Sequence, residues 1–432
     1  MRRKLLSDGA QELNYEIRDI VKKAEQVQAS GVKIFWENIG DPIPKNNQVP
    51  AWIKEIIGDL TLENRTYGYC HSKGILETRQ FLSDKTNALN GVQITADDVL
   101  FFNGLGDAIS KVYQYLVPAS RVIGPSPAYS THSSAEAANA AADPITYRLD
   151  PNNQWFPDME DLYNKIKYNP NIVGLLIINP DNPTGMVYPE ETLIKLIEIA
   201  KEFDLFVISD EIYSNITYNG ARAITLAEII GDVPGIAMKG ISKEFPWPGS
   251  RCGWLEFYNR DMDPEFNRLC NTLDKAKMIE VCSTTLPQLS IPKVMSDPRY
   301  LPYRQEANDA IGRRATKIAN ILGSVPDLIF NKTYGAFYNT IVFRDGVLKP
   351  HQTLPIDNPE LEAKVSEWTQ SVDLDKRFVY YLLASTGVCV VPISSFCSEL
   401  SGFRVTLLEE DEDLLVEIFS KIKNAVIQYL AS

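Results

Sequence analysis

The sequence contains no apolar run of the roughly 18–20 residues that a membrane-spanning helix needs. Its longest apolar run, 172–178, has the length of a strand. The first residues are basic, but Ser7 and Asp8 follow at once, so the start of the chain lacks the apolar centre of a secretory signal. These absences predict a cytoplasmic protein that makes no use of a membrane.

Residue types that hold metals or build histidine triads are also scarce. The chain has 3 histidines, at 71, 132 and 351, and its 6 cysteines include no CxxC pair. This spacing does not favour a zinc site or a histidine-based triad. We expect the cysteines to be reduced thiols in the cytoplasm.

Basic residues are outnumbered by acidic ones, 43 to 56, which gives a net charge of −13. A chain this acidic is a poor candidate for nucleic-acid binding, which needs clustered lysine and arginine. The hydrophobic fraction of 44% is ordinary for a globular protein and leaves enough apolar residues for a sizeable core. A length of 432 residues predicts two or three domains, or one large domain with an appendage.

Apolar runs of strand length alternate with helical patterns between residues 99 and 240, which predicts an α/β fold with a mostly parallel sheet covered on both faces. The strand candidates are 99–103, 121–124, 172–179, 205–209 and 236–240. Beyond residue 300 the pattern loosens, with helices expected at 307–322 and 413–430 and strands at 334–342, 388–391 and 402–408. This change predicts a second domain of mixed α and β structure, and the proline-rich segment 38–50 is expected to cross between the domains.

Polar residues follow four of these strands, where ligands bind at the carboxyl edge of a parallel sheet. They are GLGD at 104–107, NPDNPTG at 179–185, SDEIY at 209–213 and GISK at 240–243. Taken singly, NPDNPTG could be a turn, Asp210 a helix cap or an exposed carboxylate, and Lys243 a surface lysine. Together they match the needs of pyridoxal phosphate: a lysine for its aldehyde, a carboxylate for its ring nitrogen, and donors for its ring oxygen and phosphate.

The motifs also resemble, in order and over nearly the whole chain, the class I pyridoxal-phosphate aminotransferases of fold type I. The resemblance rests on NPDNPTG at 179–185, DEIY at 210–213, and Ser242 and Lys243 followed by PGSRCGW at 248–254. Further matches are NIGDP at 38–42, GFRV at 402–405, and Tyr69, Gly74 and Arg79 at five-residue intervals. The resemblance implies a large cofactor domain at 48–305 and a smaller α+β domain formed by 1–47 and 306–432.

The resemblance implies a role for each matching residue. Lys243 forms the Schiff base and then acts as general base, and Asp210 pairs with the ring nitrogen. The other implied cofactor contacts are Tyr213 and Asn182 at the ring oxygen, Tyr129 on the ring face, and Leu105, Gly106, Ser242 and Arg251 near the phosphate. Tyr69 is implied to reach the phosphate of a neighbouring subunit, and therefore a homodimer with shared sites. Gly40, Asn182 and Arg404 are implied to receive the substrate.

Two positions depart from the family pattern. Gly240 stands three residues before the lysine, where many members have a hydroxyl residue, and Gly106 replaces a serine or threonine of the glycine loop. Both changes remove side-chain contacts to phosphate. Ser242 and Asp107 are the candidates to compensate for them, and we expect a lower affinity for the cofactor than is usual.

The amino donor is less well defined. Tyr15 and Arg18, with YGYCHSKG at 67–74 and WFPD at 155–158, resemble the bacterial alanine (glutamate–pyruvate) branch. This predicts that Tyr15 and Arg18 bind substrate, although a helix start that packs on the small domain is equally typical. The segment 275–285 shows no arginine for a distal carboxylate, which weighs against an aspartate enzyme. The motifs are also compatible with a β-lyase on the same fold and, less well, with a cofactor-binding regulator.

Overall fold

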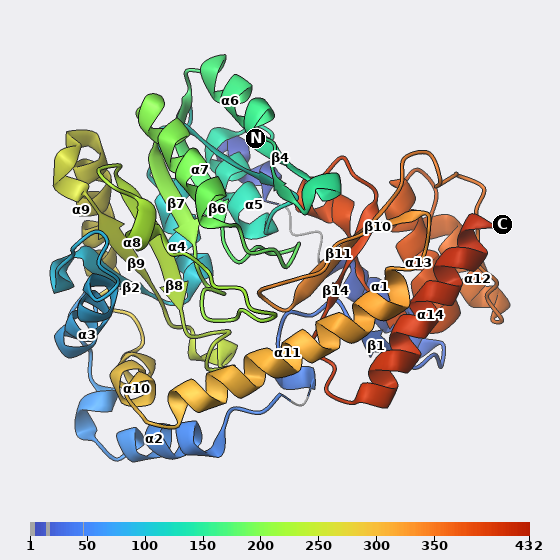
Figure 1. The fold of residues 1–432 in the computed structure, drawn as a ribbon, viewed down its shortest axis with the longest axis horizontal. Coiled ribbons are helices and arrows are strands. Elements are labelled where there is room, and N and C mark those ends of the chain that lie inside the picture. The colour runs from blue at the N-terminus through green and yellow to red at the C-terminus, as the bar shows by residue number, and fades with distance from the viewer. Residues whose placement is uncertain (1–4, 14–17, 46) are drawn as a thin grey trace.

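The computed structural model describes residues 5–13, 18–45 and 47–432 (Figure 1). An eight-stranded sheet lies at its centre, in the order β2-β9-β8-β7-β6-β3-β4-β5. The strands are β2 (Val99–Phe102), β3 (Arg121–Ser126), β4 (Thr146–Asp150), β5 (Phe156–Pro157), β6 (Ile172–Ile178), β7 (Phe206–Asp210), β8 (Gly235–Gly240) and β9 (Gly253–Tyr258). Only β9 and β5 run antiparallel to their neighbours. Because β9 separates β2 from β8, those two strands run in the same direction and end at the same edge.

Helices cover both faces of this sheet, as the alternation of apolar side chains along β6 requires. Leu175 and Ile177 belong to one buried core, and Leu176 and Ile178 to another on the opposite face. The helices are α2 (Ala51–Thr61), α3 (Leu76–Asn87), α4 (Leu105–Gln114), α5 (Ser130–Ala140), α6 (Met159–Lys167), α7 (Glu190–Glu202), α8 (Leu226–Ile229), α9 (Pro264–Ile279) and α10 (Thr285–Met295). The prediction of a mostly parallel sheet between two helical layers is confirmed.

A smaller antiparallel sheet is built from the C-terminal third of the chain, in the order β10-β11-β14-β13. Its strands are β10 (Leu328–Phe330), β11 (Tyr338–Phe343), β13 (Val391–Pro392) and β14 (Gly402–Thr406). A separate parallel pair joins β1 (Phe35–Trp36) to β12 (Val388–Cys389). The helices here are α1 (Asp19–Ala29), α12 (Pro359–Trp368), α13 (Leu374–Thr386) and α14 (Glu412–Leu430). Ile20 and Phe35 share a core with Ile418, so the two ends of the described chain pack together.

The long helix α11 (Tyr300–Leu322) runs from α10 beside the large sheet to α14 beside the small one (Figure 1). It begins seven residues before the expected start at 307, because Pro302 lies in the first turn, where a missing N–H costs little. The helix therefore crosses the boundary expected at 305, and the domain limits stay a prediction.

The strand expected at 388–391 is divided between two sheets. Val388 and Cys389 pair in parallel with β1, and Val391 pairs in antiparallel fashion with Arg404 of β14. All four residues from 388 to 391 are buried, so the uniform apolar pattern gives no sign of where the chain changes its partner. Within the described part of the chain, no helix is both long and apolar enough to span a membrane.

Candidate active site

The carboxyl ends of β2, β6, β7 and β8 open onto a cavity of about 390 Å³. Its wall is completed by residues 38–41, which follow β1, and by Arg404 on β14. The predicted site residues that line it are Arg18, Gly40, Leu105, Gly106, Tyr129, Asn182, Asp210, Tyr213, Ser242, Lys243, Arg251 and Arg404. Tyr69 does not line it, and Tyr15 lies outside the described residues. Twelve positions spread over nearly four hundred residues thus meet at one place.

Lys243 lies just beyond the end of β8, and its side chain is partly buried. Its Nζ donates a hydrogen bond of 2.6 Å to the backbone carbonyl of Gly40. Burial lowers the pKa of Lys243 to about 8, and the charges of Arg404 and Arg251 act in the same direction, whereas Asp41 opposes them. A larger fraction of this amine than of an exposed lysine is therefore neutral, and hence nucleophilic, near pH 8.

We expect this pKa to be visible in the reactivity of the amine. In cofactor-free protein, acylation of Lys243 by an amine-specific reagent should increase with pH and reach half its maximum near pH 8, because only the neutral amine reacts. Peptide mass spectrometry measures the modified fraction, with the exposed Lys275 as the internal control. A Lys243 profile that follows that of Lys275 would contradict the lowered pKa.

Asp210 ends β7 and is 3% exposed. Its Oδ2 lies 3.2 Å from Nε2 of His132, and its Oδ1 accepts the backbone N–H of Ile212 at 3.1 Å. The hydroxyl of Tyr113 lies 3.4 Å from Nδ1 of His132. Burial raises the pKa of Tyr113, so this hydroxyl keeps its proton and can donate it to Nδ1. With Nδ1 as acceptor, the single ring proton of the neutral imidazole lies on Nε2, where it faces the carboxylate.

Tyr213 lies next to the carboxyl end of the same strand. Its hydroxyl is 3.0 Å from that of Tyr338 on β11. Burial raises the pKa of Tyr213, and the proximity of Tyr338 raises it further. The hydroxyl is therefore a protonated donor at neutral pH, as a contact with a ring oxygen requires.

Arg404 is 3% exposed, and its guanidinium is held on several sides. Nη1 donates to Oδ1 of Asn182 at 3.3 Å, and Nη2 donates to the backbone carbonyl of Asn38 at 2.6 Å. The ring of Tyr338 lies 4.4 Å from the guanidinium carbon. Nε is buried and has no hydrogen-bond partner among the residues described. A planar cation with a donor to spare is suited to bind a carboxylate.

Arg251 and the start of α4 lie close together at the other end of the cavity. Gly104 precedes this helix with φ +89°, and a Cβ there would lie 2.4 Å from Nη2 of Arg251. The glycine therefore lets the guanidinium approach the helix N-terminus, where Leu105 and Gly106 have backbone N–H groups that the helix itself leaves unpaired. Such an arrangement of a guanidinium and a helix N-terminus favours a phosphate or another anion.

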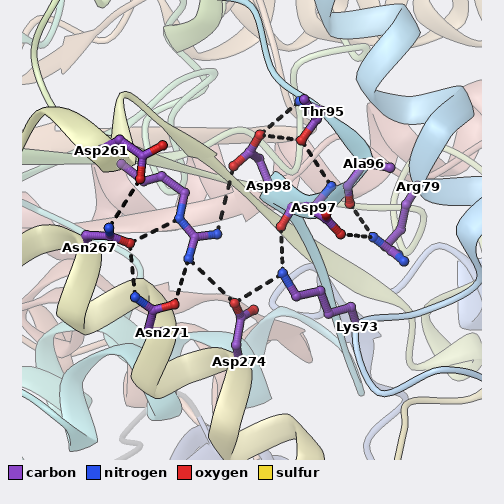
Figure 2. A network of polar contacts seen from close by, with 11 residues as sticks. Lys73, Arg79, Thr95, Ala96, Asp97, Asp98, Asp261, Asn267, Asn271 and Asp274 are labelled. Carbon is purple, nitrogen blue, oxygen red and sulfur yellow. Dashed lines mark hydrogen bonds and ion pairs between the residues drawn. The ribbon is translucent and has the colours of Figure 1, made fainter.

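The segment of Tyr69 is anchored outside this cavity. Arg79 on α3 donates from Nε to the carbonyl of Gly74 at 3.1 Å. Nζ of Lys73 lies 3.1 Å from Oδ2 of Asp274 on α9, within the polar network that Figure 2 shows. Tyr69 itself is 87% exposed. The spacing of Tyr69, Gly74 and Arg79 thus has a structural explanation: the hydrogen bond from Arg79 to Gly74 holds a loop in which Tyr69 lies on the surface.

Comparison with known proteins identifies the family. Residues 38–418 match Aminotransferase class I and II. An uncharacterized aminotransferase of Methanocaldococcus jannaschii is 50% identical over 430 residues, which is 100% of both chains. The glutamate-pyruvate aminotransferase AlaA of Escherichia coli is 33% identical over 244 residues, 56% of this chain and 59% of that protein. The solved alanine aminotransferase of Pyrococcus furiosus superposes with a TM-score of 0.83 at 28% identity, covering 97% of this chain and 100% of that one.

The chain belongs to the class I and II aminotransferases. It is a pyridoxal-phosphate-dependent transaminase of fold type I. The resemblance stated from the sequence motifs is therefore confirmed at the level of family, fold and enzyme class.

The residues of this aminotransferase fit the cofactor that the family uses. The buried carboxylate of Asp210, the amine of Lys243 and the cationic corner at Arg251 all line one cavity. They match, respectively, the ring nitrogen, the aldehyde and the phosphate of pyridoxal phosphate. The close approach of Gly104 to Arg251 forms a cradle that any larger residue would fill.

Sequence reasoning missed several residues of this aminotransferase site. Asn38 and Asp41 flank Gly40 in the NIGDP motif, so that motif already contained the signal for them. His132 follows Tyr129 by three residues, about one helical turn, so the two side chains lie on the same face of a helix. This spacing is only a weak signal for a site residue, because the sequence does not show which way that face points. Tyr338 lies on β11, a wholly buried strand, and nothing distinguishes it there from a core aromatic residue.

Proposed function

We propose that this aminotransferase transfers the amino group between an L-amino acid of the alanine or glutamate type and a 2-oxo acid. The observation that supports it most is Arg404, buried and oriented by Asn182 and Asn38, in the same cavity as Lys243. It supplies a fork for the α-carboxylate that every such substrate carries. Relatives named as alanine and glutamate–pyruvate aminotransferases support the choice of substrate.

Bound pyridoxal phosphate would supply an electron-withdrawing ring and the carbon that takes up the amino group. We assign Asp210 to hold a proton on the ring nitrogen, with His132 orienting the carboxylate. With the cofactor bound, Lys243 would take the proton from the substrate α-carbon and deliver it to the cofactor carbon that carries the amino nitrogen, which suits an amine whose pKa is lowered to about 8. We assign Arg251 and the start of α4 to the phosphate.

Other assigned residues bind or orient rather than transfer protons. Tyr213 and Asn182 are proposed to donate to the ring oxygen and Tyr129 to cover the ring face. Ser242 lines the cavity one residue before Lys243 and is proposed to contact the phosphate. Gly40 lines the same cavity as Arg404 and is proposed to lie against the substrate carboxylate. A larger residue does not fit there, because a Cβ would lie 1.9 Å from the hydroxyl of Tyr338.

We propose a ping-pong mechanism. Donor and acceptor both carry an α-carboxylate, and this cavity offers them one well-oriented fork, at Arg404. A donor that occupies the fork excludes the acceptor, so the first product leaves before the second substrate binds. Arg18, which also lines the cavity, is assigned to the distal carboxylate of glutamate.

The test is a half-reaction. Alanine or glutamate, added alone to the cofactor-loaded enzyme, should each change the absorbance of the bound cofactor and release about one equivalent of 2-oxo acid per site. Stopped-flow absorbance and quantification of the 2-oxo acid measure it. If neither donor produces the change while aspartate does, the substrate proposal is wrong. Continuous release of ammonia and pyruvate from a sulfur amino acid would instead indicate a β-lyase.

Arg18→Met provides the matching specificity test. We expect KM for glutamate to increase about 10- to 100-fold, the usual effect of losing a hydrogen bond to a charged group. KM for alanine should change little, because alanine has no distal carboxylate. An equal effect on both donors would show that Arg18 does not bind the distal group.

We also propose a homodimer with shared sites. Large apolar side chains are exposed around Tyr69, including Leu62 at 84% and Tyr67 at 75%. Ile279, at the end of α9, is 85% exposed, and Thr285 nearby donates to the carbonyl of Gly68 at 2.8 Å. An apolar surface of this kind is typical of an interface between subunits. A cytoplasmic location remains a prediction.

A further inference from the structure

A short loop supplies backbone acceptors to two cationic side chains of the active site, Arg404 and Lys243. It comprises residues 37–45, leaves β1 after Trp36 and returns at Lys45, the last residue of a 3₁₀ helix at Ile43–Lys45. The carbonyl of Asn38 accepts from Arg404 at 2.6 Å, and that of Gly40 accepts from Lys243 at 2.6 Å. The position of this loop therefore determines where both side chains are held.

The two ends of the loop are joined by a buried ion pair. Nζ of Lys45 lies 2.5 Å from Oε1 of Glu37. The Glu37 side chain is 0% exposed and that of Lys45 is 8% exposed. Lys45 also approaches Glu409 at 3.4 Å, just beyond β14. The first and last residues of the loop are thus tied together across the eight positions that separate them.

The same ion pair is connected to the strand that carries Arg404. Thr406, two residues further along β14, donates from its hydroxyl to Oε2 of Glu37 at 2.8 Å. Its backbone N–H donates to the carbonyl of Glu37 at 3.0 Å. Glu37 therefore fixes the start of the loop against β14, and Lys45 fixes the end of the loop against Glu37.

An interior ion pair is not needed for stability alone, since well-packed apolar residues of similar volume often stabilise a fold as well or better. An apolar pair does not supply a directional contact that holds the loop in one conformation. The Glu37 carboxylate makes two such contacts, one to Lys45 and one to the hydroxyl of Thr406.

We propose that Glu37 and Lys45 are positioning residues for substrate recognition: their ion pair closes the 37–45 loop and sets the Asn38 and Gly40 carbonyls against Arg404 and Lys243. The inference rests on the proposed role of Arg404 in binding the α-carboxylate. Neither residue of the pair lines the cavity. Their effect is transmitted through the backbone of the loop.

The experiment compares Lys45→Met, Glu37→Gln and the double variant, each with cofactor bound. We expect KM for the amino donor to increase about 10-fold or more, because small displacements of a binding group are costly, while kcat falls less. In cofactor-free samples of the same variants, the pH dependence of Lys243 acylation should also shift, since the Lys243 amine loses its fixed acceptor. The double variant should be no worse than the more impaired single variant, because the two residues act as one contact.

Controls separate positioning from a general loss of structure. Lys45→Arg keeps the charge and should retain a KM close to that of the unaltered enzyme. Lys201→Met removes an exposed ion pair with Asp232 and should leave KM and the pH profile of Lys243 acylation unchanged. If Lys45→Met melts below the assay temperature, the isosteric Glu37→Gln decides, because it removes charge and keeps volume.

Arg404→Lys distinguishes the role of Arg404 in binding the α-carboxylate from the positioning role of Glu37 and Lys45. If it leaves KM unchanged, the proposed role of Arg404 is wrong. If it raises KM while Glu37→Gln and Lys45→Met do not, the role of Arg404 stands and the positioning pair is refuted. Elevated KM in all three variants, with Lys45→Arg near normal, supports both.

Discussion

Lys243→Ala is expected to lower the rate of transamination by about 10⁴-fold or more. A well-placed general base alone contributes up to about 10⁴-fold, and this variant also loses the amine that would bond to the cofactor. Multiple-turnover assays with alanine and 2-oxoglutarate measure the loss. Lys275→Ala, which removes an exposed lysine, should be fully active.

Covalent trapping tests the same residue independently of rate. Borohydride treatment of the cofactor-loaded protein should leave the cofactor attached to the peptide that contains Lys243, and Lys243→Ala should lose this product. An unchanged rate in Lys243→Ala, or attachment to another lysine, would refute the assignment on which the proposed chemistry depends.

Lys243→Ala also allows a test of the shared sites. If Tyr69 of one subunit completes the site of the other, a hybrid of Lys243→Ala and Tyr69→Ala subunits contains one intact site and one doubly altered site. After random exchange in an equal mixture, half the dimers are hybrids, so about a quarter of the sites should be intact. Activity well above that of either variant supports the shared site, and no gain on mixing excludes it.

The sequence motifs predicted the residues of the cavity better than the extent of the elements around them. The motifs that contain Asp210 and Lys243 lie at strand ends, and parallel strands necessarily bring their carboxyl ends to one edge. Helix α11 begins at Tyr300, seven residues before the expected start at 307, and Pro302 is tolerated because it lies in the first turn. The local motifs identified residues that line one cavity because the chemistry they suggest restricts the residue types, whereas element boundaries also depend on packing.

The sequence did not reveal contacts that depend on how the helices, strands and loops are oriented relative to one another. His132 reaches Asp210 across 78 positions, and Lys45 reaches Glu37 only because the loop between them closes on itself. Tyr338 faces Tyr213 from the other sheet. Each of these residues could equally be an ordinary core or surface side chain, and only the packing of the two sheets shows which partner it meets.

Asp210→Asn is expected to reduce kcat by about 10²–10³-fold, the usual loss when a single preorganised electrostatic contact is removed. The variant has nearly the same volume and can still accept the N–H of Ile212, so the fold and cofactor binding through Arg251 should survive. It cannot hold a proton on the ring nitrogen, so the substrate α-proton becomes less acidic. Stopped-flow half-reactions measure the loss, with Asp204→Asn, exposed just before the same strand, as control. A variant within 10-fold of the unaltered rate would show that Asp210 does not support the ring charge.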